Sequence, residues 1–454
     1  MKRISLALIL MFVILPFCGA DTAVASDYVM KDLPQLDNGI VIAADVLNKG
    51  SEQLIAGKGN KVFIYDQTEL VGTISGFSGN VTALAVGDMN GNFRLEILVG
   101  TDAFNVHIYQ LVNEEWLEID VKRYFWAPIS SLKVADITGN GWGDMIVTNA
   151  RGDAYIYLSW EGKLDIFWRS KPSEPVKFIT ADNLTGSLAD DVVLTHDSGY
   201  VEVISWKDEK LRTLWQGYPW GTIDSLILTP IKAESPSQIL ILTDQNIFYS
   251  WKWDGNTFVP QYHFHQRLDG KIIGYHSEFG LIAISPKSGI TFYNVGSNVL
   301  EKVFNINLTA ISDIVFYNEQ LVVKDVGSRY YALQSIDLED IDIYINGELV
   351  DTPIEFLINE GRLYVSLDDI TSILGWMKFG TKQRIFLIKG LNYLVVDGEQ
   401  GQILWHNIPL PLHELISKDN LIYLPLESIS IFGYEVRLDC TNNQLDLSRN
   451  WGWW

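Results

Sequence analysis

One short loop contains side chains that could hold a divalent cation. The stretch VADITGNGWGDMIV, residues 134–147, is apolar at both ends and polar in the middle. Calcium binds six to eight oxygens drawn from carboxylates, amides, hydroxyls and backbone carbonyls. The candidate ligands are the side chains of Asp136, Thr138, Asn140 and Asp144 and the carbonyl of Trp142. Because only two are carboxylates, the loop predicts a structural calcium site of modest affinity.

A hydrogen-bonded turn explains the same loop without a metal. A short Asp side chain can accept loop N–H groups as an Asx-type turn, so both interpretations stay open at Asp136. A second loop has the same spacing at Asp88, Asn90, Asn92 and Glu96. It has Phe93 where a glycine would ease the turn, so it predicts a weaker calcium site.

The loop belongs to a unit that recurs along the chain. Asp45, Asp88, Asp136 and Asp182 each follow an apolar strand pattern and are 43 to 48 residues apart. A polar loop, a short apolar strand, a tight turn and an alternating strand follow each aspartate. Further on the aspartate is lost but the strands continue, which gives seven units between about residues 40 and 335. This period, with about four short strands per unit, is typical of β-propeller blades.

In these residues the chain resembles the FG-GAP/VCBS-type propeller repeats. The repeat loop reads Asp-x-(Asp/Asn/Thr)-x-(Asp/Asn)-Gly-x-x-(Asp/Glu), and residues 136–144 fit it. The resemblance implies a mainly β fold with a seven-bladed propeller over residues 36–335. The family includes many secreted bacterial proteins.

A different pattern begins near residue 340. The pair Asn346-Gly347 predicts a hairpin, and apolar residues at helical spacing follow it. RLYVSLDDITSILGW, residues 362–376, then matches LIYLPLESISIFGYEV, residues 421–436. This duplication resembles the copper amine oxidase N-terminal-like domain, or stalk domain, which implies a small α+β module over residues 340–448. In amine oxidases the copper lies in another domain, so we predict no copper and no oxidase activity.

Composition and the first residues suggest where the protein works. Residues 1–25 have a basic start, an apolar core and a small-x-small end, which predicts a secretory signal peptide. No later segment is long and apolar enough to predict a transmembrane span. The net charge of −22 argues against nucleic acid as a partner. After signal cleavage Cys440 is the one cysteine left, so no internal disulfide is expected.

A Gly- and Pro-containing loop offers a candidate ligand-binding surface. It carries Trp215, Tyr218 and Trp220 within six residues. Exposed aromatic rings stack on sugars and on protein partners, but buried ones pack between blades, and both interpretations are open.

These patterns together predict a secreted, non-catalytic binding or adhesion protein of the cell envelope, from a Gram-positive bacterium. Its propeller would recognise an extracellular polysaccharide or protein. The alternative is a secreted propeller enzyme, a polysaccharide hydrolase or lyase acting at the central channel, although no catalytic residue is identified. The roles of Cys440 and of the tail Trp451–Trp454 are not predicted.

Overall fold

The computed structural model describes residues 27–449 with short internal gaps. The gaps are 161–162, 172, 231–234, 263–267, 269, 277–279, 286–288, 296–299, 307, 309, 319, 337, 339–340, 351, 353, 360–361, 382, 390–391, 398–401, 406–407, 410–414, 419–420 and 441–443. The predicted signal peptide, residues 1–25, and the tail Trp451–Trp454 lie outside the described residues. Among the described residues, no helix has the length and hydropathy needed to cross a membrane.

Six four-stranded antiparallel sheets follow one another along the first part of the chain, each with its strands in chain order. The first is β2 (Ile40–Ala44), β3 (Gln53–Lys58), β4 (Lys61–Asp66) and β5 (Glu69–Ser75), and the second is β6 (Val81–Gly87), β7 (Glu96–Thr101), β8 (Val106–Val112) and β9 (Glu115–Lys122). The third is β10 (Ile129–Ala135), β11 (Asp144–Asn149), β12 (Ala154–Trp160) and β13 (Lys163–Arg169), and the fourth is β14 (Val176–Asp182), β15 (Asp191–His196), β16 (Val201–Lys207) and β17 (Lys210–Gly217). The fifth is β18 (Ile223–Thr229), β19 (Gln238–Thr243), β20 (Phe248–Trp253) and β21 (Phe258–Tyr262), and the sixth is β22 (Lys271–His276), β23 (Gly280–Ser285), β24 (Gly289–Val295) and β25 (Leu300–Ile306).

A seventh sheet combines the two ends of this region. It contains β26 (Ile311–Tyr317), β27 (Gln320–Asp325) and β28 (Tyr330–Ile336), and its fourth strand is β1 (Asp27–Asp32). β1 runs antiparallel to β28, with Asp27 opposite Ile336. A short 3-10 helix, η1 (Pro34–Leu36), links β1 to β2. The sheet therefore uses residues that precede the predicted propeller boundary at residue 36.

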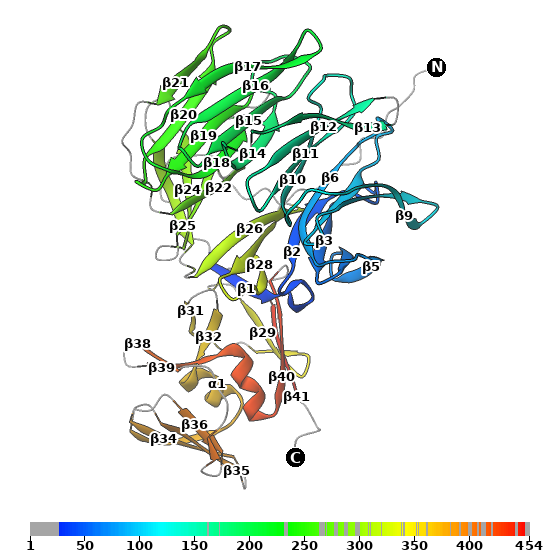
Figure 1. The fold of residues 1–454 in the computed structure, drawn as a ribbon. Coiled ribbons are helices and arrows are strands. Elements are labelled where there is room, and N and C mark those ends of the chain that lie inside the picture. Colours follow the sequence, from blue (N-terminus) through cyan, green and yellow to red (C-terminus); the bar gives the residue numbers. More distant parts are fainter. Residues whose placement is uncertain are drawn as a thin grey trace, which may run out of the picture.

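The sheets pack side by side as a β-propeller does. The first strands of the first six sheets contact one another in chain order, β23 of the sixth sheet contacts β26, and β26 contacts β2, so the contacts form a closed circuit (Figure 1). The second strands β7, β11, β15 and β19 are buried along their whole length. The outer strands β9, β13 and β17 are largely exposed. Burying both faces of the second strand favours apolar residues along its centre, which is why the sequence reads ILV at residues 97–99 and VVL at residues 192–194.

Residues 342–449 form three further sheets and two short helices. The sheets contain β29 (Asp342–Ile345), β30 (Glu348–Leu349), β40 (Tyr434–Asp439) and β41 (Gln444–Arg449); β31 (Phe356–Asn359), β32 (Arg362–Ser366), β38 (Ile416–Lys418) and β39 (Leu421–Pro425); and β33 (Met377–Thr381), β34 (Arg384–Lys389), β35 (Asn392–Asp397), β36 (Gln402–Trp405) and β37 (Ile408–Pro409). The helices are α1 (Leu367–Ile373) and the 3-10 helix η2 (Leu426–Phe432). In Figure 1 these elements (yellow to red) lie beyond β1 and β28.

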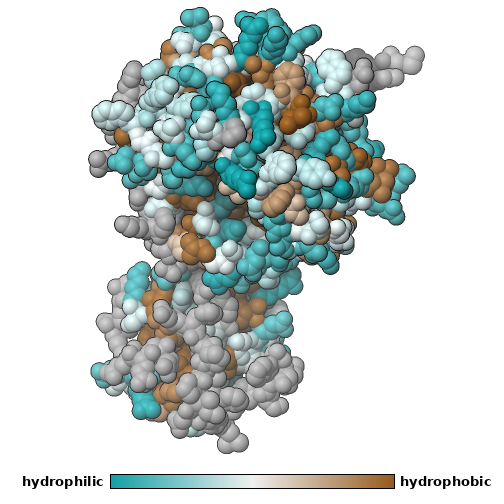
Figure 2. Space-filling model, viewed as in Figure 1, coloured by the Kyte–Doolittle hydropathy of each residue, from teal (hydrophilic) through white to brown (hydrophobic). Residues whose placement is uncertain are grey.

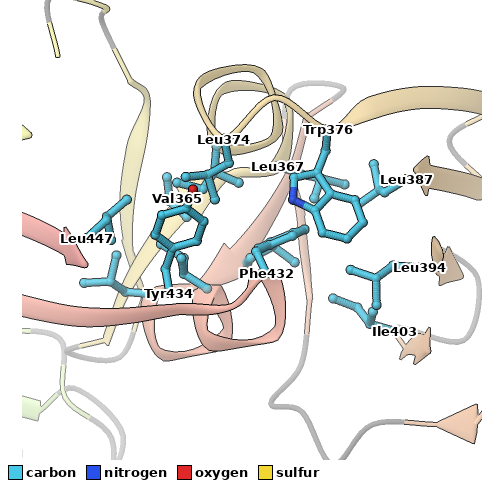
Figure 3. Packing of buried hydrophobic residues seen from close by; sticks show 14 of the residues in the cluster. Val365, Leu367, Leu374, Trp376, Leu387, Leu394, Ile403, Phe432, Tyr434 and Leu447 are labelled. Atoms are coloured by element: carbon cyan, nitrogen blue, oxygen red, sulfur yellow. The ribbon is translucent and has the colours of Figure 1, made fainter. Parts of the chain in front are cut away.

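The sequence duplication corresponds to a pair of strand–helix units that share one core. β32 and β39 pair antiparallel, with Tyr364 opposite Pro425. The helices that follow them bury equivalent residues in one cluster, including Leu367, Ile370, Leu426 and Ile429. Figure 3 shows Trp376 of this cluster close to Phe432, and their ring centroids are 5.3 Å apart. The first unit forms an α-helix and the second a 3-10 helix.

Candidate functional site

The Asp136 loop is a hydrogen-bonded turn between β10 and β11. The two carboxylate oxygens of Asp136 accept the N–H groups of Asn140 at 3.0 Å and Gly141 at 2.7 Å. The side-chain oxygen of Asn140 accepts the N–H of Trp142 at 2.8 Å. These are the bonds of an Asx-type turn, and left-handed φ values at Gly139 and Gly141 allow it to close.

The Asp144 side chain also holds this turn in place. It is fully buried, and its Oδ2 accepts the N–H groups of Ile137 at 2.9 Å and Thr138 at 3.2 Å. Its Oδ1 accepts the N–H of Ser159, on β12, at 2.6 Å. Burial raises the pKa of Asp144 to about 7, although the hydrogen bonds from these backbone N–H groups oppose the rise.

The Asp88 loop between β6 and β7 is built in the same way. Asp88 accepts the N–H groups of Gly91 at 2.7 Å and Phe93 at 2.6 Å. Buried Glu96 accepts the N–H of Met89 at 2.7 Å and an amide hydrogen of Asn90 at 2.9 Å. Phe93 takes the left-handed φ of 61° that glycine would favour, and its side chain is 89% exposed.

These donors bear directly on metal binding. At Asp136, Asp144 and Asp88 the carboxylate oxygens accept backbone N–H groups, so each carboxylate already has a role in closing its turn without a cation. Among the described residues, no group of three or more His, Cys, Asp or Glu is placed to hold a metal. Thr138 Oγ1, one of the predicted ligands, is buried and has no hydrogen-bond partner among the described residues. The arrangement fits a turn, and calcium at the predicted ligands stays a prediction.

The aspartate loops also join neighbouring sheets. The N–H of Gly143 donates to the backbone oxygen of Asp88, and the N–H of Asp190 donates to that of Asp136 at 2.8 Å. The indole of Trp142 lies against Gly91, where a Cβ would come within 2.4 Å of the ring. Trp142 and the two aspartates therefore hold successive loops together.

The opposite ends of the strands carry exposed aromatic residues. In an antiparallel sheet, the turn between second and third strands and the connection to the next sheet lie at the same end. We call this end the aromatic-loop face. Its exposed aromatic side chains are Phe104 (41% exposed), Tyr124 (76%), Trp126 (62%), Tyr218 (73%) and Trp220 (76%). Residues of high hydropathy form separate patches among hydrophilic ones on the visible side of the propeller (Figure 2).

The predicted aromatic cluster is divided by the structure. Tyr218 and Trp220 are exposed between β17 and β18, and the N–H of Trp220 donates to Tyr249 Oη at 2.8 Å. Trp215, on β17, instead packs on Trp251 with ring centroids 5.4 Å apart. Its side chain therefore contributes to packing between sheets.

Sequence reasoning missed Tyr124 and Trp126, in the connection from β9 to β10. Both have left-handed φ values, 72° and 64°, and the buried Phe125 lies between them. Phe125 anchors the connection because its N–H donates to the backbone oxygen of Phe104 at 3.3 Å. The run YFWAP directly before a blade-forming strand is the signal that could have identified them.

Comparisons with solved structures identify the class of protein as a β-propeller. The β-propeller domain of Myceliophteria thermophila Cps50 (Swd1) is similar with 13% identity and a TM-score of 0.50, over 68% of this chain and 100% of that one. Saccharomyces cerevisiae Sqt1 is similar with 12% identity and a TM-score of 0.51, over 75% of this chain and 96% of that one. The predicted mainly β propeller fold is confirmed.

The family comparison is more specific but covers less of the chain. A model of the family described as "KPTN: KICSTOR complex protein kaptin" matches residues 62–157, from β4 into β12. A search of curated proteins finds no match to the chain.

This match corrects several predictions. The family that matches is described as a component of a complex, not as an FG-GAP or VCBS protein. The predictions of a secreted bacterial protein at the cell envelope, of an extracellular polysaccharide as ligand and of a secreted propeller enzyme are wrong. The physical reason is that the Asp-x-Thr-x-Asn-Gly pattern meets the hydrogen-bonding needs of a turn between two blade strands. Such a pattern reports the turn and not the cellular compartment.

Proposed function

We propose that the chain is a non-catalytic scaffold subunit that binds a partner protein through the aromatic-loop face. In this proposal residues 27–336 are a seven-bladed propeller, and residues 340–448 are a separate module of the stalk-like type. The match to a family described by its membership of a complex supports a role in a protein assembly. The proposal includes no copper and no catalytic centre.

The proposal rests on the exposure of large aromatic side chains in the connections that lead from one sheet to the next. Tyr124 and Trp126 precede the third sheet, and Tyr218 and Trp220 precede the fifth. Each is more than 60% exposed, whereas Trp215 and Trp251 pack within the propeller. Exposed Trp and Tyr are costly in water and dominate the energetics of protein interfaces, so their placement at one end of the sheets favours a protein-binding surface.

Affinity purification with matched variants tests the proposal. Trp126→Ala combined with Trp220→Ala removes two aromatic side chains from the aromatic-loop face. Phe93→Ala removes a ring that is 89% exposed from the aspartate loops at the other end of the sheets. We expect a partner protein to bind the wild-type chain and Phe93→Ala but not the double variant. The same partner, once purified, should bind the wild-type chain and Phe93→Ala directly. A purified partner that binds all three alike would refute the proposal.

A further inference from the structure

Three connections of the fourth sheet bring two aromatic rings, a histidine and two carboxylates together. His196 ends β15, Tyr200 precedes β16 and Tyr218 follows β17. The rings of His196 and Tyr200 stack with centroids 4.1 Å apart and planes 11° apart. The Tyr218 ring lies 5.8 Å from that of Tyr200. We call this group, with Glu174 and Glu202, the Tyr200 site.

The two carboxylates lie against the rings. Glu174 Oε2 accepts a hydrogen bond from the hydroxyl of Tyr200 at 3.3 Å. Glu202 Oε1 accepts one from Thr213 Oγ1 at 2.6 Å, and Glu202 Oε2 lies 4.0 Å from His196 Nε2. Among the described residues, neither glutamate has a lysine or arginine partner. Burial and the nearby charges of Glu174 and Glu202 raise the pKa of Tyr200 to about 12, which is the response of a hydroxyl in a negative environment.

The buried side chain of His196 contains polar atoms that lack hydrogen-bond partners. The residue is 4% exposed, and neither ring nitrogen has a hydrogen-bond partner within the described part of the chain. The separation of 4.0 Å between its Nε2 and Glu202 Oε2 is too long for a hydrogen bond. A buried polar atom without a partner is costly, and one of the two nitrogens of a neutral imidazole is an acceptor, so a donor that reached this nitrogen would be stabilised there.

We propose that the Tyr200 site receives an arginine side chain of the partner protein. A guanidinium group carries a positive charge, donates hydrogen bonds to carboxylates and stacks on aromatic faces. The site supplies matching features in Glu202, Glu174 and the exposed ring of Tyr218, which is 73% exposed. The net charge of −22 would also draw a basic partner toward this chain. The inference rests on the proposed function, because it names the chemistry of one contact on the aromatic-loop face.

The test uses the full chain and two fluorescein-labelled peptides, Gly-Ser-Arg-Gly-Ser and the same peptide with citrulline in place of arginine. Citrulline keeps the shape and removes the charge. Fluorescence anisotropy should show the arginine peptide binding at least about fivefold more tightly, with the difference shrinking as salt is raised. Glu202→Gln and Tyr218→Ala should each abolish the preference. Asp165→Asn, an equal charge change on an exposed residue of β13, and Tyr124→Ala should keep it.

Thermal unfolding of each variant confirms that it is folded before binding is compared. Equal affinity for the two peptides, or a preference that survives both Glu202→Gln and Tyr218→Ala, would overturn the inference. Choline that competes far better than the arginine peptide would overturn it in favour of a small quaternary ammonium ligand. Loss of a partner from the Trp126 and Trp220 double variant with no arginine preference leaves the proposed function standing. An arginine preference, with no partner lost from the double variant, supports the Tyr200 site and refutes the proposed function.

Discussion

The backbone oxygen of Asp88 accepts the N–H of Gly143 at 2.7 Å, and this bond joins the aspartate loop of one sheet to that of the next. The contact leaves no room for a side chain at residue 143. A Cβ there would lie 2.4 Å from Val134 Cγ1 and 2.8 Å from the Asp88 oxygen.

Gly143→Ala should therefore destabilise the propeller. Relieving the clash requires Val134 to shift and the two loops to separate, and overpacking of this kind costs about 1–3 kcal/mol. Urea unfolding followed by fluorescence measures the loss. Gly274→Ala is the matched control, because its Cβ would meet only Phe316 at an ordinary 3.6 Å. Equal stability of the two variants would show that the sheets can separate here without cost.

Asp144 should make stability depend on pH. Its pKa is raised to about 7 in the folded chain, above the ordinary value of 3.8, so the folded state binds its proton more tightly. Stability from this group is then greatest below about pH 4 and falls as pH rises to about 7. Relative to Asp144→Asn, the wild type should lose on the order of 2 kcal/mol between pH 5 and pH 8. Parallel pH profiles for the two proteins in urea unfolding would contradict this assignment.

The turn and calcium interpretations of the Asp136 loop predict different responses to EDTA. Because both Asp136 oxygens already accept N–H groups, we expect EDTA to leave the unfolding temperature unchanged. Asp136→Ala should lower it, since the N–H groups of Asn140 and Gly141 lose their acceptor and hydrogen bonds of this kind contribute about 1 kcal/mol. A saturable rise with added calcium that Asp136→Asn abolishes would instead establish the metal site. Differential scanning calorimetry distinguishes these outcomes.

Trp376→Ala should weaken residues 342–449 without weakening the propeller. The side chain is 6% exposed and packs on Phe432, so its removal should cost about 3–5 kcal/mol locally. Hydrogen exchange should accelerate in β34 and β35 while β11 and β15 stay protected. Met377→Ala, at a residue 58% exposed, is the control. Faster exchange throughout the chain would refute the division into separate units.

The sequence predicted the elements whose pattern is local. The aspartate loops at Asp88 and Asp136 lie between first and second strands because a short acceptor and nearby glycines suit that turn. The pairing of β1 with β28 was missed, since it joins residues 27 and 336 and no local pattern encodes it. The exposure of Tyr124 was missed although the run YFWAP could have indicated it, and the packing of the partly buried Trp215 was one of two interpretations that the sequence left open. Both are aromatic residues in or beside loops, and only tertiary packing separates them.

The strand β1 imposes an order on folding. Its partner β28 is made about 300 residues later, so during synthesis the seventh sheet stays incomplete while the other sheets form. Until β28 pairs with it, β1 offers the unpaired N–H and C=O groups of both its edges to other chains. β1 completes the propeller, but it pairs with β28 only late in synthesis. The nascent protein is therefore exposed to aggregation through this strand.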